Sequence, residues 1–96
     1  MRGWSLAPVF LPVEVYERGP WRVCQRSEST WAVAFQLPDG REGDVLDTDG
    51  TQSWWLTARA AMMWCNFRSQ RRSGSRFRVG IGRKVVEVAT PLPVLP

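Results

Sequence analysis

The sequence contains no histidine among its 96 residues. Histidine is the commonest general base and the commonest protein ligand of metal ions at neutral pH, so two large classes of active site lose their usual central residue. A Cys–His or Ser–His catalytic pair is impossible, and any catalysis would rest on carboxylates, a cysteine or the single lysine. We therefore expect a protein that is not an enzyme and that holds no metal and no cofactor.

Cysteine is nearly as scarce. Cys24 and Cys65 are the only two, they lie 41 positions apart, and neither belongs to a CxxC pair or to another ligand spacing. Cys24 falls in an expected strand and Cys65 on the apolar face of an expected helix. Both are interpreted as small buried hydrophobic residues rather than as a disulfide or a metal site.

Long apolar runs are also missing. No stretch approaches the roughly 18 apolar residues of a membrane span. Pro8 and Pro12 interrupt the apolar N-terminal segment and no small-residue cleavage site follows it, so a signal peptide is not expected. These features predict a soluble, cytoplasmic protein that does not contact a membrane.

Two familiar binding motifs fail on comparison with the sequence. The acidic segment 39–50 lacks the ligands of an EF-hand, because Val45 and Leu56 stand where oxygen donors are needed. Gly80 and Gly82 resemble the start of a dinucleotide fingerprint, but position 85 is a valine and a strand rather than a helix is expected there. The acids are accordingly assigned to turns and helix caps.

What is present indicates one globular domain spanning residues 1–96. Hydrophobic residues make up 44% of the chain and charged residues 23%, which is the usual balance of a folded domain. Residues 1–12 and 91–96 are proline-rich and are expected to be extended termini. The six tryptophans are more than one small core needs, so some are expected to meet a partner or a ligand.

Periodicity predicts an α+β fold. Alternating apolar and polar residues predict a meander of strands in the first half and a hairpin at the end. The expected strands are 13–17, 21–26, 30–37, 41–48, 76–82 and 84–90. Together with one helix they give an antiparallel sheet of five to six strands packed on one central helix, in the order β-β-β-β-α-β-β.

The helix is expected over residues 52–70, with Asp49 or Thr51 as its cap. Steps of about 100° per residue place its apolar side chains on two separate arcs. One arc holds Trp54, Trp55, Ala58, Ala61, Met62 and Cys65, and the other holds Leu56, Ala60, Met63, Trp64 and Phe67. A helix on one sheet needs a single arc, so the proline-rich termini or a second copy of the chain should cover the other.

Charge is distributed unevenly along the chain. Residues 1–66 carry six arginines against eight acids, whereas residues 67–86 carry seven positive charges and no acid. Such a basic segment indicates a polyanionic partner, and an exposed tryptophan beside it could stack on a base. The candidate nucleic-acid-binding residues are Arg68, Arg71, Arg72, Arg76, Arg78, Arg83 and Lys84. We expect them to converge on a loop and one hairpin face, which makes the protein a small binding protein for DNA or RNA.

The sequence leaves an alternative open. The basic segment then only solvates the surface, and the protein is a homodimeric interaction module or a module that binds a small ligand. The interface or ligand residues in that case are the bulky side chains around the expected helix. They are Trp54, Trp55, Met63, Trp64 and Phe67.

Overall fold

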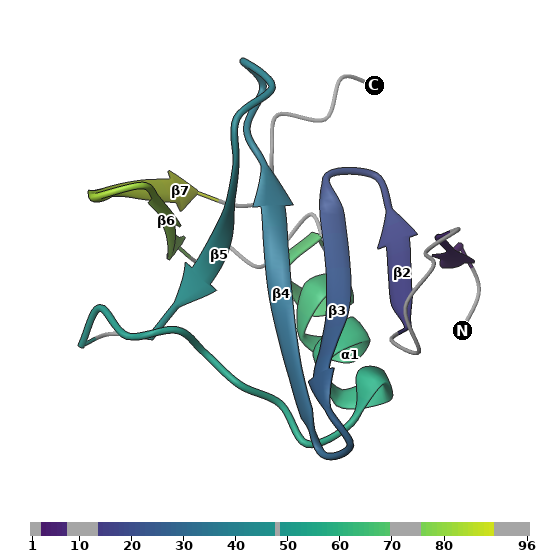
Figure 1. The fold of residues 1–96 in the computed structure, drawn as a ribbon. Coiled ribbons are helices and arrows are strands. Elements are labelled where there is room, and N and C mark those ends of the chain that lie inside the picture. Colours follow the sequence, from purple (N-terminus) through teal and green to yellow (C-terminus); the bar gives the residue numbers. More distant parts are fainter. Residues whose placement is uncertain (1–2, 8–13, 48, 70–75, 90–96) are drawn as a thin grey trace.

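A computed structural model describes residues 3–7, 14–47, 49–69 and 76–89, which form one antiparallel sheet and one helix (Figure 1). The elements in chain order are β1 (Ser5–Leu6), β2 (Val15–Arg18), β3 (Trp21–Ser27), β4 (Thr30–Gln36), β5 (Glu42–Leu46), α1 (Ala58–Ser69), β6 (Arg76–Ile81) and β7 (Lys84–Ala89). The α+β fold with one helix packed on one sheet is confirmed. The two-residue strand β1 lies in the segment expected to be irregular, and it brings the sheet to seven strands.

The order of strands in the sheet follows their order in the chain, and every neighbouring pair is antiparallel. Short turns join β2 to β3, β3 to β4, β4 to β5 and β6 to β7. All but the β3–β4 turn contain the glycine or proline that predicts a turn. The helix is inserted between β5 and β6, which are nevertheless direct neighbours. The chain therefore leaves the sheet after β5, builds α1 and returns to the same edge.

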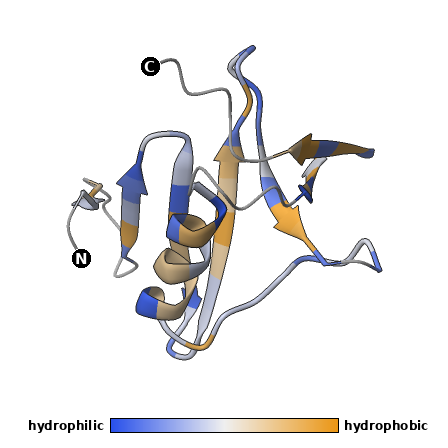
Figure 2. Cartoon of the chain, turned by 180° about the vertical axis from the view of Figure 1, so that it is seen from behind, coloured by the Kyte–Doolittle hydropathy of each residue, from blue (hydrophilic) through white to orange (hydrophobic). Residues whose placement is uncertain are grey.

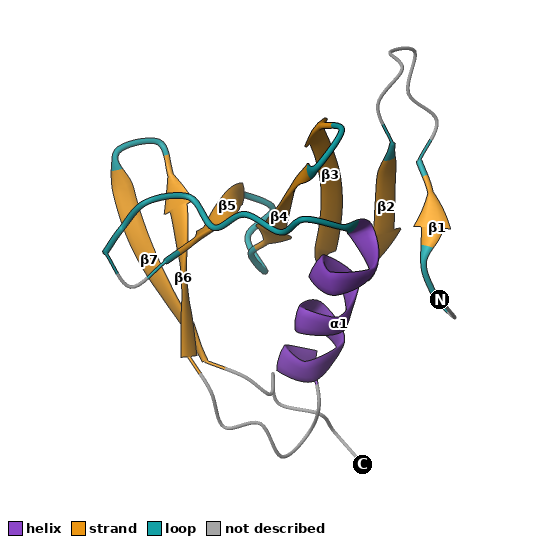
Figure 3. Cartoon of the chain, turned by 90° about the horizontal axis from the view of Figure 1, so that it is seen from below, coloured by secondary structure: helices purple, strands orange, loops and turns teal. Residues whose placement is uncertain are grey.

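Strands β5 and β6 approach each other closely where they cross, at Gly43 of β5 and Gly80 of β6. A Cβ atom on Gly43 would collide with the backbone carbonyl oxygen of Gly80, so this crossing tolerates no larger residue at position 43. The β6–β7 hairpin beyond the crossing swings away from the long β3–β4 pair (Figures 1 and 3). The hairpin thus becomes a separate wall, opposite the helix.

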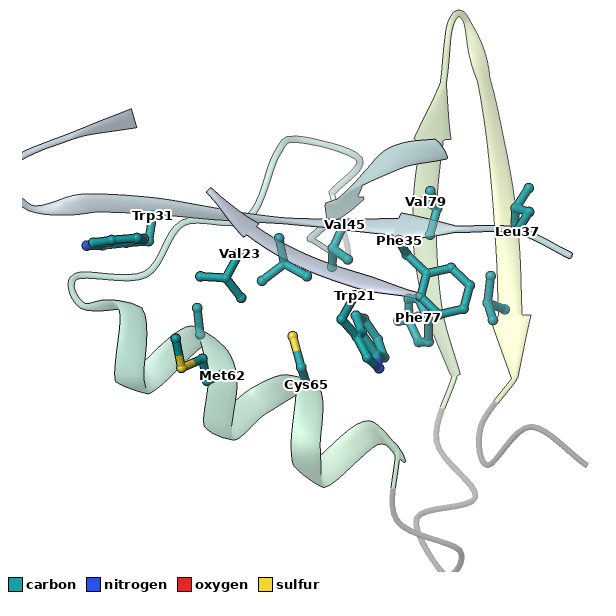
Figure 4. Packing of buried hydrophobic residues seen from close by; sticks show 13 residues of the cluster. Trp21, Val23, Trp31, Phe35, Leu37, Val45, Met62, Cys65, Phe77 and Val79 are labelled. Atoms are coloured by element: carbon teal, nitrogen blue, oxygen red, sulfur yellow. The ribbon is translucent and has the colours of Figure 1, made fainter. Parts of the chain in front are cut away.

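The core lies between α1 and the inner face of β3 and β4. Met62 and Cys65 of the helix point toward Val23 and Trp21 of β3 (Figure 4). β4 is hydrophobic along most of its length, and so is the C-terminal end of β5 (Figure 2). Burial of alternate side chains on β3 and of nearly all on β4 accounts for the alternating pattern of residues 21–26 and the apolar run of residues 30–37.

The helix begins later than predicted. Its first residue is Ala58, and its cap is Thr57, whose Oγ1 accepts a hydrogen bond from the backbone N–H of Ala60 at 3.1 Å. Asp49, expected as a cap, instead closes a turn by accepting hydrogen bonds from the backbone N–H and the hydroxyl of Thr51. The start of the helix at residue 52 and both predicted caps are therefore wrong.

The reason is that residues 52–55 form isolated bridges to strands β4 and β5. The backbone N–H of Trp55 donates to the carbonyl of Trp31 at 2.9 Å, and the N–H of Trp31 donates back at 2.7 Å. The N–H of Ser53 donates to the carbonyl of Val45 at 3.1 Å. The start of β4 and the end of β5 diverge, and residues 52–55 lie between these two strand ends. Trp54 and Trp55 are therefore not helical residues.

The outward face of α1 keeps its apolar side chains. Met63 and Phe67 are each 54% exposed, and Leu56, just before the helix, is 77% exposed. The proline-rich termini that were expected to cover them lie largely outside the described residues. Cover by the termini or by a second copy therefore stays a prediction. Within the described part of the chain, no helix has the length and apolarity that a membrane span requires.

Candidate functional site

A pocket of about 510 Å³ lies between the C-terminal half of α1, the loop that follows β5, and the β6–β7 hairpin. Its volume falls within the range of about 300–1,000 Å³ that is usual for sites of small ligands. Figure 3 shows the loop crossing from the hairpin side of the molecule to the start of α1. Three elements distant in sequence therefore build one concavity.

The loop supplies two tryptophans to the pocket wall. Trp55 is fixed by its two backbone hydrogen bonds with Trp31, and its side chain packs against the core. Trp54 is also on the pocket wall, but 52% of it is exposed. The extended backbone that anchors Trp55 thus presents the neighbouring indole to solvent.

The helix supplies Trp64 and Arg68, which lie one turn apart on the same face. The guanidinium carbon of Arg68 is 5.0 Å from the centre of a Trp64 ring, in the range of a cation–π contact. The Trp64 ring is also 5.4 Å from that of Trp55 and 5.7 Å from that of Phe77. Trp64 therefore connects the pocket to the aromatic core.

The hairpin supplies two arginines and an acid. Arg76 and Arg78 of β6 share one face of the strand, and Glu87 of β7 stands directly opposite Arg78. The Nη1 atom of Arg76 is 3.3 Å from a carboxylate oxygen of Glu87. Both side chains are exposed, so this ion pair contributes little to stability, but it offsets part of the positive charge of the hairpin wall.

A second acid, Asp47, faces the pocket from the loop. The hydroxyl of Ser53 donates a hydrogen bond of 2.6 Å to its Oδ1, and Ser53 is itself buried. The backbone of Asp47 is tied as well, because its N–H donates to the carbonyl of Thr51 and its own carbonyl accepts from the N–H of Gly50. The carboxylate is therefore held in one orientation at the pocket wall.

The seven candidate cations are divided by the structure. Arg68, Arg76 and Arg78 line the pocket, and Arg71 and Arg72 lie outside the described residues. Arg83 and Lys84 sit at the tip of the hairpin, since Ile81 pairs with Lys84 there while Arg76 pairs with Ala89 at the other end. The five candidate cations that the structure describes thus form two groups: three line the pocket, and two lie at the tip of the hairpin.

The five candidate aromatic and apolar residues are divided too. Trp54, Trp55 and Trp64 line the pocket, where they meet the arginines, whereas Met63 and Phe67 are exposed on the outward side of α1. Sequence reasoning missed Asp47 and Ser53 as pocket residues. Their pairing gave no local signal beyond a serine six positions after an acid.

Neither cysteine lines the pocket, and both are free thiols. Burial strongly raises the pKa of the Cys65 thiol, and burial also raises the pKa of Cys24 against the opposing effect of Arg26 and Arg22. Both thiols therefore stay protonated at neutral pH. Cys65 is buried as predicted, whereas Cys24 is only half-buried.

Comparisons with models of protein families, with curated proteins and with solved structures find no match to this chain.

Proposed function

We propose that this protein is a non-enzymatic binder of single-stranded nucleic acid, DNA or RNA, that takes one nucleotide unit of the strand into the pocket. The observation that carries the proposal is the meeting of three tryptophans and three arginines in one cavity. The ligand that satisfies both sets has a flat aromatic part and an anionic part joined closely together. A nucleotide has this composition.

The tryptophans would bind the base, and the arginines would bind the phosphate. Indole rings stack on bases of any sequence, and each stacked base contributes about 1–3 kcal/mol to binding. Trp54, with half of its surface exposed, is the ring that can accept a base without displacing core packing. Arg68, Arg76 and Arg78 place guanidinium groups on the pocket wall, and guanidinium groups bind phosphate oxygens through paired N–H donors.

A single strand suits this site better than a duplex. Bases in a duplex are stacked on one another and paired, so a pocket receives only a base that has left the helix. A single strand delivers such a base without the cost of unpairing. Arg83 and Lys84 at the hairpin tip would add backbone contacts along the strand, which predicts a marked salt dependence.

The test is a titration of fluorescently labelled octathymidylate and octauridylate, followed by fluorescence anisotropy at about 50 mM and about 200 mM salt. We expect dissociation constants on the order of 1–100 µM that rise steeply with salt, and weaker binding of a hairpin duplex with eight base pairs. Comparable binding of the duplex would contradict the single-strand assignment. Undetectable binding of both single strands at the lower salt concentration would refute the function itself.

A second candidate function is homodimerisation through the outward face of α1. The exposure of Met63 and Phe67 favours it, because bulky apolar side chains four positions apart form one stripe. Against it, the helix carries arginine and no acid, so two copies packed through this face would bring like charges together. Sedimentation velocity at micromolar concentration tests it directly: a monomer excludes the dimer, and a dimer dissociated by Phe67→Glu establishes it.

A further inference from the structure

Asp47 is an unexpected residue in a pocket that receives an anion. A carboxylate repels phosphate, so it weakens the attraction that the three arginines provide. The other acid of the pocket, Glu87, is neutralised by Arg76. Asp47 takes part in none of the five ion pairs formed among the described residues. Its charge therefore remains available to a ligand.

The carboxylate is also held in a fixed orientation. Ser53 occupies one lone pair of Oδ1 at 2.6 Å, and two backbone hydrogen bonds tie the residue into its turn. A carboxylate has about four acceptor sites, so Oδ2 and the rest of Oδ1 can still accept hydrogen bonds. A side chain oriented in this way contributes to discrimination, because little freedom is lost when the ligand binds.

The acceptor pair of a carboxylate distinguishes the bases. Two parallel N–H donors side by side match it, and guanine alone has them, at N1–H and the 2-amino group. Adenine and cytosine place an acceptor nitrogen beside their amino group, and thymine and uracil flank one N–H with two carbonyl oxygens. Each of these edges sets an acceptor against the carboxylate, which costs free energy because the bound base displaces water from the carboxylate.

We infer that Asp47 is a specificity-determining residue that recognises the Watson–Crick edge of guanine, so that the pocket selects guanine from a single strand. This inference rests on the proposed function, since it requires the base to enter the pocket. Trp54 supplies stacking that any base receives. Asp47 adds the preference for guanine, and the hydrogen bond from Ser53 holds the Asp47 carboxylate in its orientation.

The experiment uses labelled octathymidylates that carry one central guanine, adenine, cytosine or hypoxanthine, with plain octathymidylate as the reference. The affinity for the guanine octamer is expected to exceed the affinities for the adenine and cytosine octamers and for plain octathymidylate about tenfold, which is the size of one good bidentate contact. Hypoxanthine lacks the 2-amino group and retains N1–H, so its octamer is expected to bind with intermediate affinity. Octauridylates with the same central bases show whether the preference holds in RNA.

Three variants assign the preference to the residue. Asp47→Asn keeps an acceptor for Ser53 but can turn an amide N–H₂ toward the base, so the guanine preference should disappear while binding of octathymidylate persists. Ser53→Ala leaves the charge unchanged and should reduce the preference. Glu28→Gln removes one negative charge at the exposed β3–β4 turn and should leave the preference intact. Thermal unfolding followed by circular dichroism establishes that each variant is folded.

The outcomes separate the two claims. If all octamers bind the parent protein equally, or if a folded Asp47→Asn protein keeps the preference, the assignment of guanine to Asp47 is wrong and the binding of single strands stands. If no octamer binds, the proposed function fails and the inference fails with it.

Discussion

Trp21 and Trp54 are the same residue type in two opposite situations. Trp21 is 4% exposed, its ring packs against Phe35 at 4.7 Å and Phe77 at 5.2 Å, and its Nε1–H donates to the hydroxyl of Ser69 at 2.7 Å. Trp54 is 52% exposed and lies on the pocket wall. The core under β3 and β4 is thus satisfied internally, whereas the pocket presents aromatic surface that a ligand could cover. The core should determine stability, and the pocket should determine binding.

The largest expected effect is that of Trp21→Ala on stability. Removing a buried indole leaves a cavity in the aromatic core, so the free energy of unfolding should fall by about 3–5 kcal/mol. A decrease of this size is a large share of the total stability of a small domain. Urea denaturation followed by circular dichroism measures it.

The matched variant Trp54→Ala should lower the free energy of unfolding by less than about 1 kcal/mol, because the Trp54 side chain is half exposed. Equal decreases in the two variants would show that core and pocket are not distinct in this sense.

The next effect is that of Trp54→Ala on binding. Removal of one stacking surface should weaken binding of octathymidylate by about tenfold, since stacking of one base contributes about 1–3 kcal/mol. Leu56→Ala is the control, because Leu56 is more exposed than Trp54 but lies outside the pocket. Trp54→Phe should recover part of the affinity. If Leu56→Ala weakens binding as much as Trp54→Ala, the strand does not bind through the pocket.

A smaller difference should separate the two ends of the β6–β7 hairpin. Arg76→Ala with Arg78→Ala removes two charges from the pocket, and Arg83→Ala with Lys84→Ala removes two from the tip. Both double variants lower the net charge equally, so general electrostatic attraction falls alike. The pocket pair should reduce affinity about tenfold and the tip pair a few-fold. Removal of each side chain that binds a phosphate should also flatten the salt slope by about one. Equal reductions in affinity would favour a diffuse cationic surface over a defined pocket.

The sequence predicted the sheet well for a physical reason. In β3 and β6 alternate residues face the core, so the alternation along the chain records burial directly. The helix start was wrong because its cause is distant in sequence. Trp55 fits the apolar spacing of a helix, but its backbone is hydrogen-bonded to that of Trp31, 24 positions earlier. The local sequence pattern does not reveal that hydrogen bonding.

The residues that line the pocket were predicted as two unrelated groups. Charge clustering identified Arg68, Arg76 and Arg78, and the excess of tryptophan together with the apolar spacing around the expected helix identified Trp54, Trp55 and Trp64. The arginines and the tryptophans meet in one pocket because β6 pairs with β5 after the helix. No single stretch of the sequence encodes that pairing. Asp47 was assigned to a turn, and the turn is present, but the aim of its carboxylate depends on the burial of Ser53. Residue types were therefore predictable, and their arrangement was not.

The last comparison, in which Trp54→Ala should have no effect, uses Cys65 as a reporter of the core. Burial raises the pKa of this thiol, so at pH 8 very little of the reactive thiolate is present and the reaction with Ellman's reagent should be slow. Trp54→Ala should leave the rate for Cys65 unchanged, because the half-exposed side chain of Trp54 is not part of the core cluster that covers the thiol. Trp21→Ala should accelerate it, since opening of the core becomes more frequent as the protein loses stability. A Cys24→Ala background removes the half-buried thiol from the signal. Acceleration by Trp54→Ala would show that Trp54 supports the core as well, and the division between the two tryptophans would then be one of degree.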